Sequence, residues 1–176
     1  MAPDRLKRNF KATQPNRKWS TDITEFKVLG QKMYLSPILD LFNGEIVSYS
    51  VSKTPNFHLV KSMLEKAFQK YPDPGPVILH SDQGWHYQMR PYRKMLGEKG
   101  IEQSMSRKGN CYDNSVIENF FGVVKTEFYT NQIFSSIDEF KTALSEYIEY
   151  YNNSRIKVKL KGLSPVQFRT QSFFSP

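Results

Sequence analysis

The stretch "QKMYLSPILDLFNGEIVSYSVS" (31–52) contains two apolar runs on either side of a turn signal. The first run, residues 31–42, predicts a largely buried strand. The Asn-Gly pair at 43–44 favours a hairpin, because both residue types tolerate the backbone conformation of tight turns. Residues 45–52 predict the returning strand, so an antiparallel hairpin is the starting point of the fold.

The segments on both sides extend this hairpin into a larger sheet. Upstream, "KWSTDITEF" (18–26) alternates in side-chain character and predicts a strand that reaches the hairpin through a turn at Gly30. Downstream, residues 56–71 carry apolar side chains at helical spacing, and the Pro-Gly-rich segment 72–76 ends that helix. The apolar residues 77–80 then predict a fourth strand.

The rest of the chain continues the alternation of helices and strands. We expect a helix near 88–98, a strand near 101–106, a loop at 107–114, helices at 114–129 and 136–151, a basic extended segment, and a short helix after Pro165. A meander followed by βαβ units predicts an α/β fold with a mixed five-stranded sheet and helices on both faces. Ribonuclease-H-like domains have this order of elements.

The predicted elements divide the chain into one domain with two extensions. We expect a basic N-terminal arm or linker at 1–18, a catalytic core at 19–152 and a basic C-terminal extension with a short helix at 153–176. A chain of 176 residues is long enough to bury roughly 70% of the surface that its unfolded state exposes. Disulfides or metals are therefore not needed for stability.

Composition narrows the possible partners. The chain has 25 Lys and Arg against 17 Asp and Glu, a net charge of +8, which favours a polyanion such as nucleic acid or a membrane surface. Its one cysteine, Cys111, allows no intrachain disulfide and no cysteine-based metal site. No apolar run approaches the ~20 residues of a membrane helix. We therefore expect a soluble, intracellular protein.

Three acids occupy positions from which they can converge. Asp22 lies within the first predicted strand, where acids are depleted. Asp82 directly follows the fourth strand, and ligands of open α/β sheets gather at such carboxyl ends. Glu118 follows Asp82 with 118 − 82 − 1 = 35 residues between them. On its predicted helix, Glu118 shares one flank of the apolar stripe with Lys125, about two turns away.

Carboxylates from two strands and a helix suit a pair of Mg²⁺ or Mn²⁺ ions, which prefer oxygen ligands. Two such ions about 3.5–4 Å apart can activate a nucleophile and stabilise the leaving oxygen when a phosphodiester is displaced. Three clustered carboxylates could not all stay ionised cheaply without cations. The pattern therefore predicts metal-dependent phosphodiester chemistry.

Each acid also has a plainer interpretation. Asp22 fits a solvated residue of an edge strand, and residues 82–84 fit a simple turn. Ser115 and Glu118 fit a capping box, with Ser115 as N-cap and Glu118 three residues later. Three further acids fit turn, strand-end or capping positions: Glu25, Asp40 and Asp113.

Together, three motifs carry a resemblance to a known family. They are "WSTDIT" (19–24), "HSDQGWHY" (80–87) and "GNCYDNSVIENFFGVVKTE" (109–127). With the 35-residue gap, they closely resemble the integrase-type catalytic core of bacterial insertion-sequence transposases, in the branch made from two overlapping reading frames with this core in the second. Retroviral integrase cores are more distantly similar. The resemblance runs from about residue 8 to about residue 170.

The resemblance implies a function and roles for particular residues. It implies that Asp22, Asp82 and Glu118 are catalytic and hold two Mg²⁺ or Mn²⁺ ions. Lys125, seven residues after the glutamate, would hold a phosphate near the scissile bond. The implied activity is that of a polynucleotidyl transferase: metal-dependent DNA cleavage at transposon ends, followed by strand transfer from the 3′-hydroxyl.

The C-terminal segment "YNNSRIKVKLKGLSP" (151–165) resembles the tail of the same family. Many relatives have His where this chain has Lys157. Basic residues alternate here with apolar ones: Arg155, Lys157, Lys159 and Lys161. One interpretation is a basic strip that contacts DNA. The other is an amphipathic edge strand whose lysines face solvent and discourage aggregation.

The implied partners are transposon-end and target DNA, with a homo-oligomer to hold two DNA ends together. The resemblance also implies helix-turn-helix segments upstream of the core, supplied by another part of the transposase, and a place in the bacterial cytoplasm at the nucleoid. Two other functions stay open. One is a DNA-binding or assembly unit without catalysis of its own. The other is a ribonuclease that acts on RNA–DNA hybrids.

Overall fold

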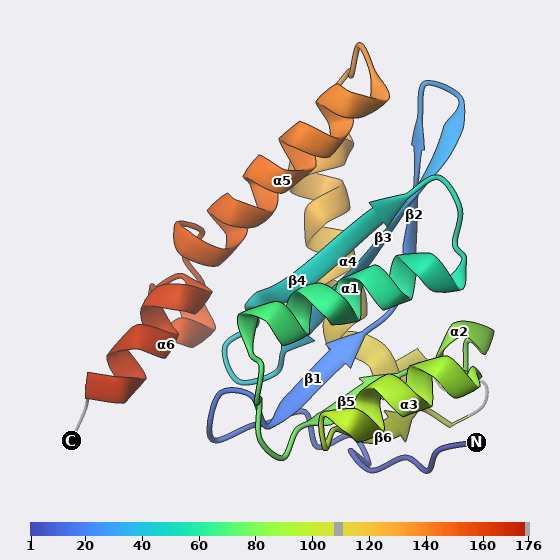
Figure 1. The fold of residues 1–176 in the computed structure, drawn as a ribbon. Coiled ribbons are helices and arrows are strands. Elements are labelled where there is room, and N and C mark those ends of the chain that lie inside the picture. The colour runs from blue at the N-terminus through green and yellow to red at the C-terminus, as the bar shows by residue number, and fades with distance from the viewer. Residues whose placement is uncertain (108–110, 175–176) are drawn as a thin grey trace.

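A mixed β-sheet lies between two layers of helices (Figure 1). It is seen in a computed structural model that describes residues 1–107 and 111–174, so that part of the predicted loop 107–114 lies outside the described residues. The elements, in chain order, are β1 (Lys18–Thr21), β2 (Thr24–Val28), β3 (Gln31–Asp40), β4 (Ile46–Ser52), α1 (Phe57–Lys70), β5 (Ile78–Ser81), α2 (Trp85–Gln88), α3 (Arg90–Glu98), β6 (Glu102–Met105), η1 (Cys111–Asn114), α4 (Ser115–Val124), η2 (Lys125–Tyr129), α5 (Ile137–Asn153), η3 (Val158–Leu160) and α6 (Pro165–Phe174).

The long strand β3 organises the sheet. β4 pairs antiparallel along one edge of β3, while β2 and β1 pair antiparallel with successive halves of the other edge. β1 then pairs parallel with β5, and β5 pairs parallel with β6. The antiparallel meander and the parallel βαβ units are thus confirmed, and β1 is the strand where they join.

The first predicted strand, residues 18–26, is divided in two. β1 ends at Thr21 and β2 begins at Thr24, so the sheet has six strand segments where five were expected. The Asp22 carboxylate accepts the N–H of Ile23 at 2.7 Å and so offers that backbone group a partner outside the ladder. The interruption falls at the first of the three candidate acids.

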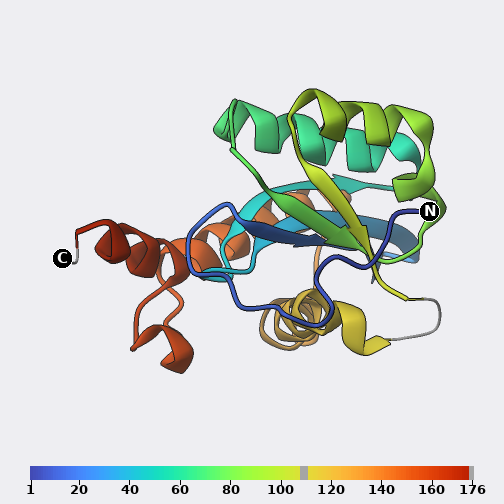
Figure 2. The same ribbon diagram turned by 90° about the horizontal axis from the view of Figure 1, so that it is seen from below.

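Each face of the sheet carries its own hydrophobic core. On one face α1 and α3 pack around Trp19, Met63 and Leu96. On the other face α4 and α5 pack around Phe120 and Phe140. Figure 2 shows the sheet between these layers, with α1 and α3 on one side and α4 on the other. The expected helices on both faces are confirmed.

Two of the expected helices are interrupted. The helix expected near 88–98 is preceded by the short helix α2, and α3 begins after Met89. The helix expected at 114–129 is α-helical to Val124 and continues as the π-helix η2 from Lys125. Single π-turns inside α-helices are rare and are frequent at functional sites.

The prediction that the basic segment after α5 is extended is wrong. Lys157 N–H donates to the carbonyl oxygen of Leu163 at 3.0 Å, and the chain between them folds into the helical turn η3. Gly162 and Lys161 both have positive φ values, which reverses the chain direction. Consequently Leu160 is buried whereas Val158 is 96% exposed, so the alternating apolar residues do not share a face.

The N-terminal arm lies against the outer edge of β6. Met105 N–H donates to the carbonyl oxygen of Pro3 at 3.2 Å, and Arg5 N–H donates to Ser104 Oγ at 2.9 Å. Leu6 is almost fully buried. These contacts make the arm part of the folded body, while the expected boundaries of the arm, the core and the C-terminal extension stay a prediction.

The β3–β4 turn holds the C-terminal helices. Asn43 Nδ2 donates to the carbonyl oxygen of Pro165 at 2.9 Å. Arg169 on α6 forms an ion pair with the buried Glu45, with 2.8 Å between Nη1 and Oε2.

No helix within residues 1–107 and 111–174 is long and apolar enough to cross a membrane.

Candidate active site

Asp22 and Asp82 leave neighbouring strands at the same level. β1 and β5 run parallel, with Trp19 opposite Leu79 and Ser20 opposite His80. Continuing this register by two residues sets Asp22 beside Asp82. The parallel pairing of β1 and β5 therefore brings together two acids that are 60 residues apart in the chain. Local sequence patterns do not predict this pairing directly.

Asp82 begins a tight turn, as its plainer interpretation required. Its Oδ1 accepts the N–H of Gly84 at 2.8 Å. A Cβ atom on Gly84 would lie 2.9 Å from that same oxygen and 3.3 Å from the ring of Tyr87. Glycine is therefore needed for the close approach, and the turn fixes the direction of the carboxylate at the end of β5.

Glu118 lies in the first turn of α4 and is exposed. The predicted capping box is wrong. The N-cap is Asn114, which makes no side-chain capping hydrogen bond, and Ser115 is already helical. The helix thus begins one residue earlier than the box would require, and the side chain of its N-cap residue, Asn114, is engaged with β1 and Asp22.

Asn114 is a site residue that the sequence interpretation missed. Its Nδ2 donates to Asp22 Oδ2 at 3.0 Å, and its Oδ1 accepts from Ser20 Oγ at 3.3 Å. It therefore ties the start of α4 to the end of β1. The residue stands four positions before Glu118 inside the quoted motif, but nothing in its spacing marks it as a partner of Asp22.

The electrostatics of Asp22 show that the three acids act on one another. Burial raises the pKa of Asp22, and the charges of Asp82 and Glu118 raise it further. The hydrogen bonds from Ile23 and Asn114 oppose this, and the resulting pKa is about 7. Within residues 1–107 and 111–174, no three His, Cys, Asp or Glu side chains lie close enough to hold one metal ion together.

His80 supports this end of the sheet without contacting the acids. It is buried, with Nδ1 2.8 Å from Ser104 Oγ and Nε2 2.9 Å from the carbonyl oxygen of Asp113. Burial lowers the pKa of His80, which favours the neutral ring. Through these contacts the histidine links β5, β6 and η1 near the end of β5, which Asp82 follows.

Two of the remaining acids have structural partners. Asp113 is buried, and hydrogen bonds from Arg107 and Arg8 hold its pKa well below the usual range. Asp40 ends β3 and accepts the N–H of Asn16 and of Phe42, each at 2.9 Å. Their interpretation as structural residues agrees with these contacts.

Lys125 begins η2, which continues the helix α4 that carries Glu118. Its Nζ is 5.7 Å from the centre of the Phe26 ring on β2, and its charge contributes to lowering the pKa of Glu25 after the larger effect of Lys32. Lys125 is also the first residue of the π-helix η2. The side chain thus lies along the flank of α4, toward β2.

Two basic residues of the tail, Arg155 and Lys157, lie against η2 and α5. Arg155 Nη2 is 2.6 Å from Glu127 Oε1, and Lys157 Nζ lies 4.3 Å from the centre of the Tyr151 ring. Lys159 is exposed. The structure therefore does not bring these three basic residues to the acids.

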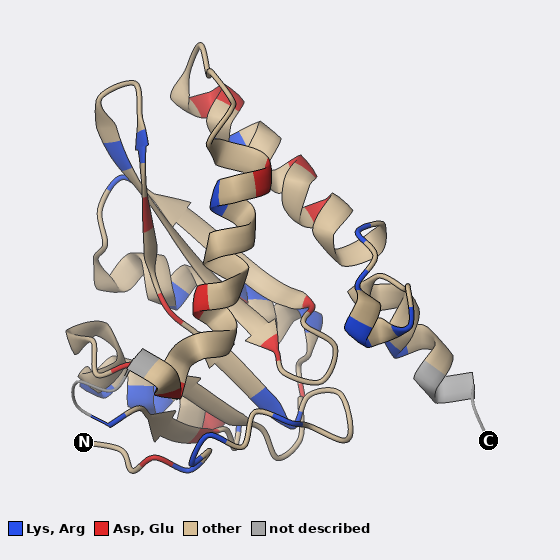
Figure 3. Cartoon of the chain, turned by 180° about the vertical axis from the view of Figure 1, so that it is seen from behind, with Lys and Arg blue, Asp and Glu red and all other residues tan. Residues whose placement is uncertain are grey.

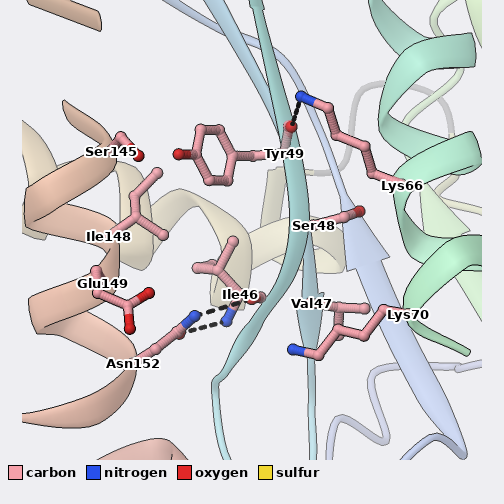
Figure 4. A pocket seen from close by; sticks show the side chains of 10 residues that line it. All are labelled: Ile46, Val47, Ser48, Tyr49, Lys66, Lys70, Ser145, Ile148, Glu149 and Asn152. Atoms are coloured by element: carbon pink, nitrogen blue, oxygen red, sulfur yellow. Dashed lines mark hydrogen bonds between the residues drawn. The ribbon is translucent and has the colours of Figure 1, made fainter. Parts of the chain in front are cut away.

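A separate groove of about 400 Å³ lies along β4, between α1 and α5 (Figure 4). Asn152 spans part of it by bonding both the N–H and the carbonyl oxygen of Ile46, and Lys66 Nζ donates to the carbonyl oxygen of Tyr49. None of the three candidate acids lines this groove. It is remote from the predicted chemistry.

Comparison with protein families gives a match over most of the chain. The integrase core domain model matches residues 12–111, and a second integrase core domain model matches residues 118–173. The putative transposase InsK for insertion sequence element IS150 of Escherichia coli K12 is 56% identical over 172 residues, which cover 98% of this chain and 61% of that protein. An uncharacterized transposase-like protein of Haemophilus influenzae is 54% identical, covering 98% of this chain and 79% of that protein. The chain thus spans about three fifths of the first relative.

Solved structures share the fold. The simian T-cell lymphotropic virus intasome, solved with the PP2A regulatory subunit B56 gamma, contains a chain with a TM-score of 0.78 and 21% identity over 94% of this chain and 57% of that one. The HTLV-2 integrase catalytic core domain, solved in complex with magnesium, gives a TM-score of 0.71 and 18% identity over 90% of this chain and 99% of that one. The ribonuclease-H-like fold is confirmed. The chain belongs to the integrase core domain family and is similar to transposases of insertion sequence elements.

Proposed function

We propose that this chain is the catalytic core of a metal-dependent polynucleotidyl transferase. It cuts DNA at the ends of a transposon and joins the freed 3′-hydroxyl to target DNA. The observation that carries the proposal is the pKa of Asp22, raised to about 7 by burial and by the charges of Asp82 and Glu118. Acids held together against their own repulsion are suited to an added cation. The transposases among the relatives of this chain support the same function.

The donor set fits Mg²⁺ or Mn²⁺. Asp22, Asp82 and Glu118 offer only oxygen ligands, as these hard cations prefer. Asp82 Oδ1 accepts one hydrogen bond, from the N–H of Gly84. An ionised carboxylate has further lone pairs that can bind an ion. The related HTLV-2 core was solved with magnesium, which supports the choice of metal. Two ions held by the three acids are our proposal, with the exposed Glu118 drawn toward the two aspartates.

Bound divalent cations would supply the positive charge that favours deprotonation of the attacking hydroxyl and stabilises the leaving oxygen. The residues of this chain supply position. The break after β1 and the turn at Gly84 fix Asp22 and Asp82, and Asn114 ties the α4 helix to Asp22. Lys125 lies about two helical turns from Glu118 and holds a phosphate near the scissile bond. Catalysis therefore rests on positioning and charge rather than on a covalent enzyme intermediate.

The net charge of +8 supports a DNA substrate, and joining two ends requires at least two copies of the active site held together. We place such an oligomer on transposon-end and target DNA at the bacterial nucleoid, with sequence recognition supplied by an upstream helix-turn-helix segment of the transposase. In the tail, Lys159 is the residue offered to DNA. Arg155 and Lys157 would have to leave Glu127 and Tyr151 to join it.

The test is the variant Asp82→Asn, which removes one metal ligand while keeping the size of the side chain. Its matched control is Asp73→Asn on the exposed loop before β5. We expect Asp82→Asn to lose Mn²⁺-dependent nicking and strand transfer on transposon-end DNA, while Asp73→Asn keeps both. Circular dichroism should show the same fold for both variants. An active Asp82→Asn protein would refute the assignment.

A second candidate function is a unit that binds DNA or other subunits without catalysis. The exposure of Glu118, together with the lack of a three-acid metal group within the described residues, is the observation that favours it. An electrophoretic shift of DNA without any metal-dependent cleavage, even with the upstream part of the transposase added, would decide for this function.

A further inference from the structure

A basic pocket lies beside the acids, between the N-terminal arm and the segment that follows β6. Its volume is about 350 Å³, and it is lined by Asp4, Lys7, Arg8 and Arg107. Figure 3 shows basic segments of the arm beside the start of α4. These residues have no part in the proposed chemistry, so their arrangement needs a reason of its own.

The acids of this cluster are buried and its cations face solvent. The carboxylate of Asp113 is 1% exposed and accepts from Arg107 Nε at 3.0 Å and from Arg8 Nε at 2.9 Å. The side chains of the two arginines are 57% and 49% exposed. Asp4, whose side chain is 11% exposed, accepts the N–H of Lys7. Two carboxylates thus lie beneath three cations, and the surface that a ligand would meet is positive.

The arm makes a tight turn beside the pocket. Lys7 and Arg8 are consecutive residues with φ values of 47° and 61°, a region that residues other than glycine adopt at a cost. The two residues form the middle of a turn that Asn9 N–H closes by donating to the carbonyl oxygen of Leu6 at 2.8 Å. Both side chains of this turn line the pocket, and Arg8 also attaches the arm to Asp113.

Residues next to the pocket contact the strand ends that carry the acids. Arg107 follows Ser106, whose N–H donates to the carbonyl oxygen of Ser81 and whose carbonyl oxygen accepts from Gln83 Nε2. Asp113 directly precedes Asn114, which contacts Asp22. The pocket is therefore connected to both strand ends that carry the candidate acids.

An exposed aromatic ring borders the pocket. Tyr112 is 70% exposed, and the guanidinium of Arg8 lies 5.8 Å from the centre of its ring. Proteins that bind single-stranded nucleic acid combine cations along the backbone with aromatic rings on which bases stack. Guanidinium groups in addition match the geometry of phosphate oxygens.

We propose that the pocket of Lys7, Arg8 and Arg107 binds a backbone phosphate of the DNA strand that enters the active site, while Tyr112 stacks against a neighbouring base. This inference rests on the proposed function for the identity of the strand. It adds a binding site outside the three acids and gives the arm a function. The pocket positions the strand and takes no part in bond breaking.

The test measures DNA binding in EDTA, so that its outcome does not depend on catalysis. The variants are Lys7→Gln and Tyr112→Ala, because replacing Arg8 or Arg107 would also remove a hydrogen-bond partner of the buried Asp113. Lys141→Gln, on the exposed surface of α5, makes the same change in net charge and is the matched control. Tyr112→Phe keeps the ring and controls for the hydroxyl.

We expect distinct effects on a short fluorescent single-stranded oligonucleotide. Lys7→Gln should reduce the slope of log affinity against log salt by about 0.7, the value for one phosphate contact on a single strand, while Lys141→Gln leaves the slope unchanged. Tyr112→Ala should weaken binding at least about fivefold at an unchanged slope, and Tyr112→Phe should bind as the unaltered chain does. Equal effects of Lys7→Gln and Lys141→Gln would overturn the proposal, because only net charge would then matter.

A scan with single methylphosphonates locates the contact. Replacing one charged phosphate at a time should reveal a position where neutralisation weakens binding to the unaltered chain but not to Lys7→Gln. If no position behaves in this way, the pocket does not hold a phosphate. If the chain binds as expected but Mn²⁺-dependent cleavage is never seen, the proposed function fails while the binding site stands.

Discussion

Two groups of acids lie at the two ends of β1, and they differ in what surrounds them. At its beginning, Asp40 pairs in register with Trp19, and Glu45 follows in the turn after β3. Both acids contact Arg169, and Glu45 also contacts Lys70 at 2.6 Å. At its end, Asp22 has the acids Asp82 and Glu118 as the neighbours whose charges raise its pKa.

The difference appears in the pKa values of Glu45 and Asp22, while burial raises the pKa of Asp40 as well. Burial raises the pKa of Glu45, but the hydrogen bond and charge of Lys70, followed by those of Arg169, outweigh it, so that the pKa is lowered. Burial and like charges raise that of Asp22 to about 7. The first group is completed by the side chains of the protein and holds the C-terminal helices, whereas the second is suited to a cation from solution.

The largest expected effect comes from breaking the completed group. Arg169→Met leaves Asp40 and Glu45 buried without their shared cation, and we expect it to lower the free energy of unfolding by about 3 kcal/mol. Urea denaturation at neutral pH measures this loss. Arg90→Met, on the exposed start of α3, is the control and should change stability by less than about 0.5 kcal/mol. Equal losses would show that the charged group is not specifically needed.

The acid-only group should respond in the opposite sense. In the absence of divalent metal at pH 8, we expect Asp22→Asn to raise the free energy of unfolding by on the order of 2 kcal/mol, because it removes a poorly solvated charge. A raised pKa means that the folded state binds more protons than the unfolded state between pH 3.8 and about 7. The gain should therefore be absent near pH 4, grow through this window and stay constant above pH 7. A gain that is equal at pH 4 and pH 8 would contradict this cause.

The pKa of Asp22 also predicts how metal affinity depends on pH. Because an ion displaces the proton, Mn²⁺ affinity should fall up to about tenfold for each pH unit below 7 and level off above it. Titration calorimetry in two buffers with different ionisation enthalpies measures both the affinity and the protons released. Constant affinity from pH 5.5 to 8 would show that Asp22 is not a ligand.

The smallest expected effect lies in the tail. Burial lowers the pKa of Lys157 to about 8, and the charge of Arg155 adds to this. Between pH 8 and 10.5 the unfolded state therefore binds more protons, and stability rises with pH. Relative to Lys157→Met, the unaltered chain should gain about 1 kcal/mol between pH 7 and pH 10, measured by urea denaturation. Lys159→Met, at an exposed position, should show no such change.

Local patterns predicted much of the fold because they depend on neighbouring residues. The turn signals at Gly30 and at 43–44, together with the apolar runs around them, predicted three strands; the structure confirms the second and third and divides the first into β1 and β2. The Pro-Gly-rich segment 72–76 correctly ended α1. The tail misled because its alternation suggested a strand, whereas the positive φ values of Lys161 and Gly162 fold it into a turn.

Among the site residues, too, some could be predicted from local sequence patterns and others could not. The three candidate acids could be named from motifs and spacing, and in the structure the charges of the other two act on Asp22. Asn114 could not be named, because its hydrogen bond to Asp22 joins residues 92 positions apart. The capping box was an interpretation of four neighbouring residues, and the structure contradicts it because Ser115 is already helical and Asn114 is the N-cap.

By itself, the sequence determined the strand and helix segments, the excess of positive charge and the acids that could take part in chemistry. These follow from side-chain periodicity, turn chemistry and composition, which act over a few residues. Only the tertiary structure decided that β1 and β5 run side by side, that the first strand breaks at Asp22, and that the arm and Arg107 line a basic pocket. Those outcomes depend on burial and on contacts between distant segments, because only in the folded chain do their charges and hydrogen bonds meet.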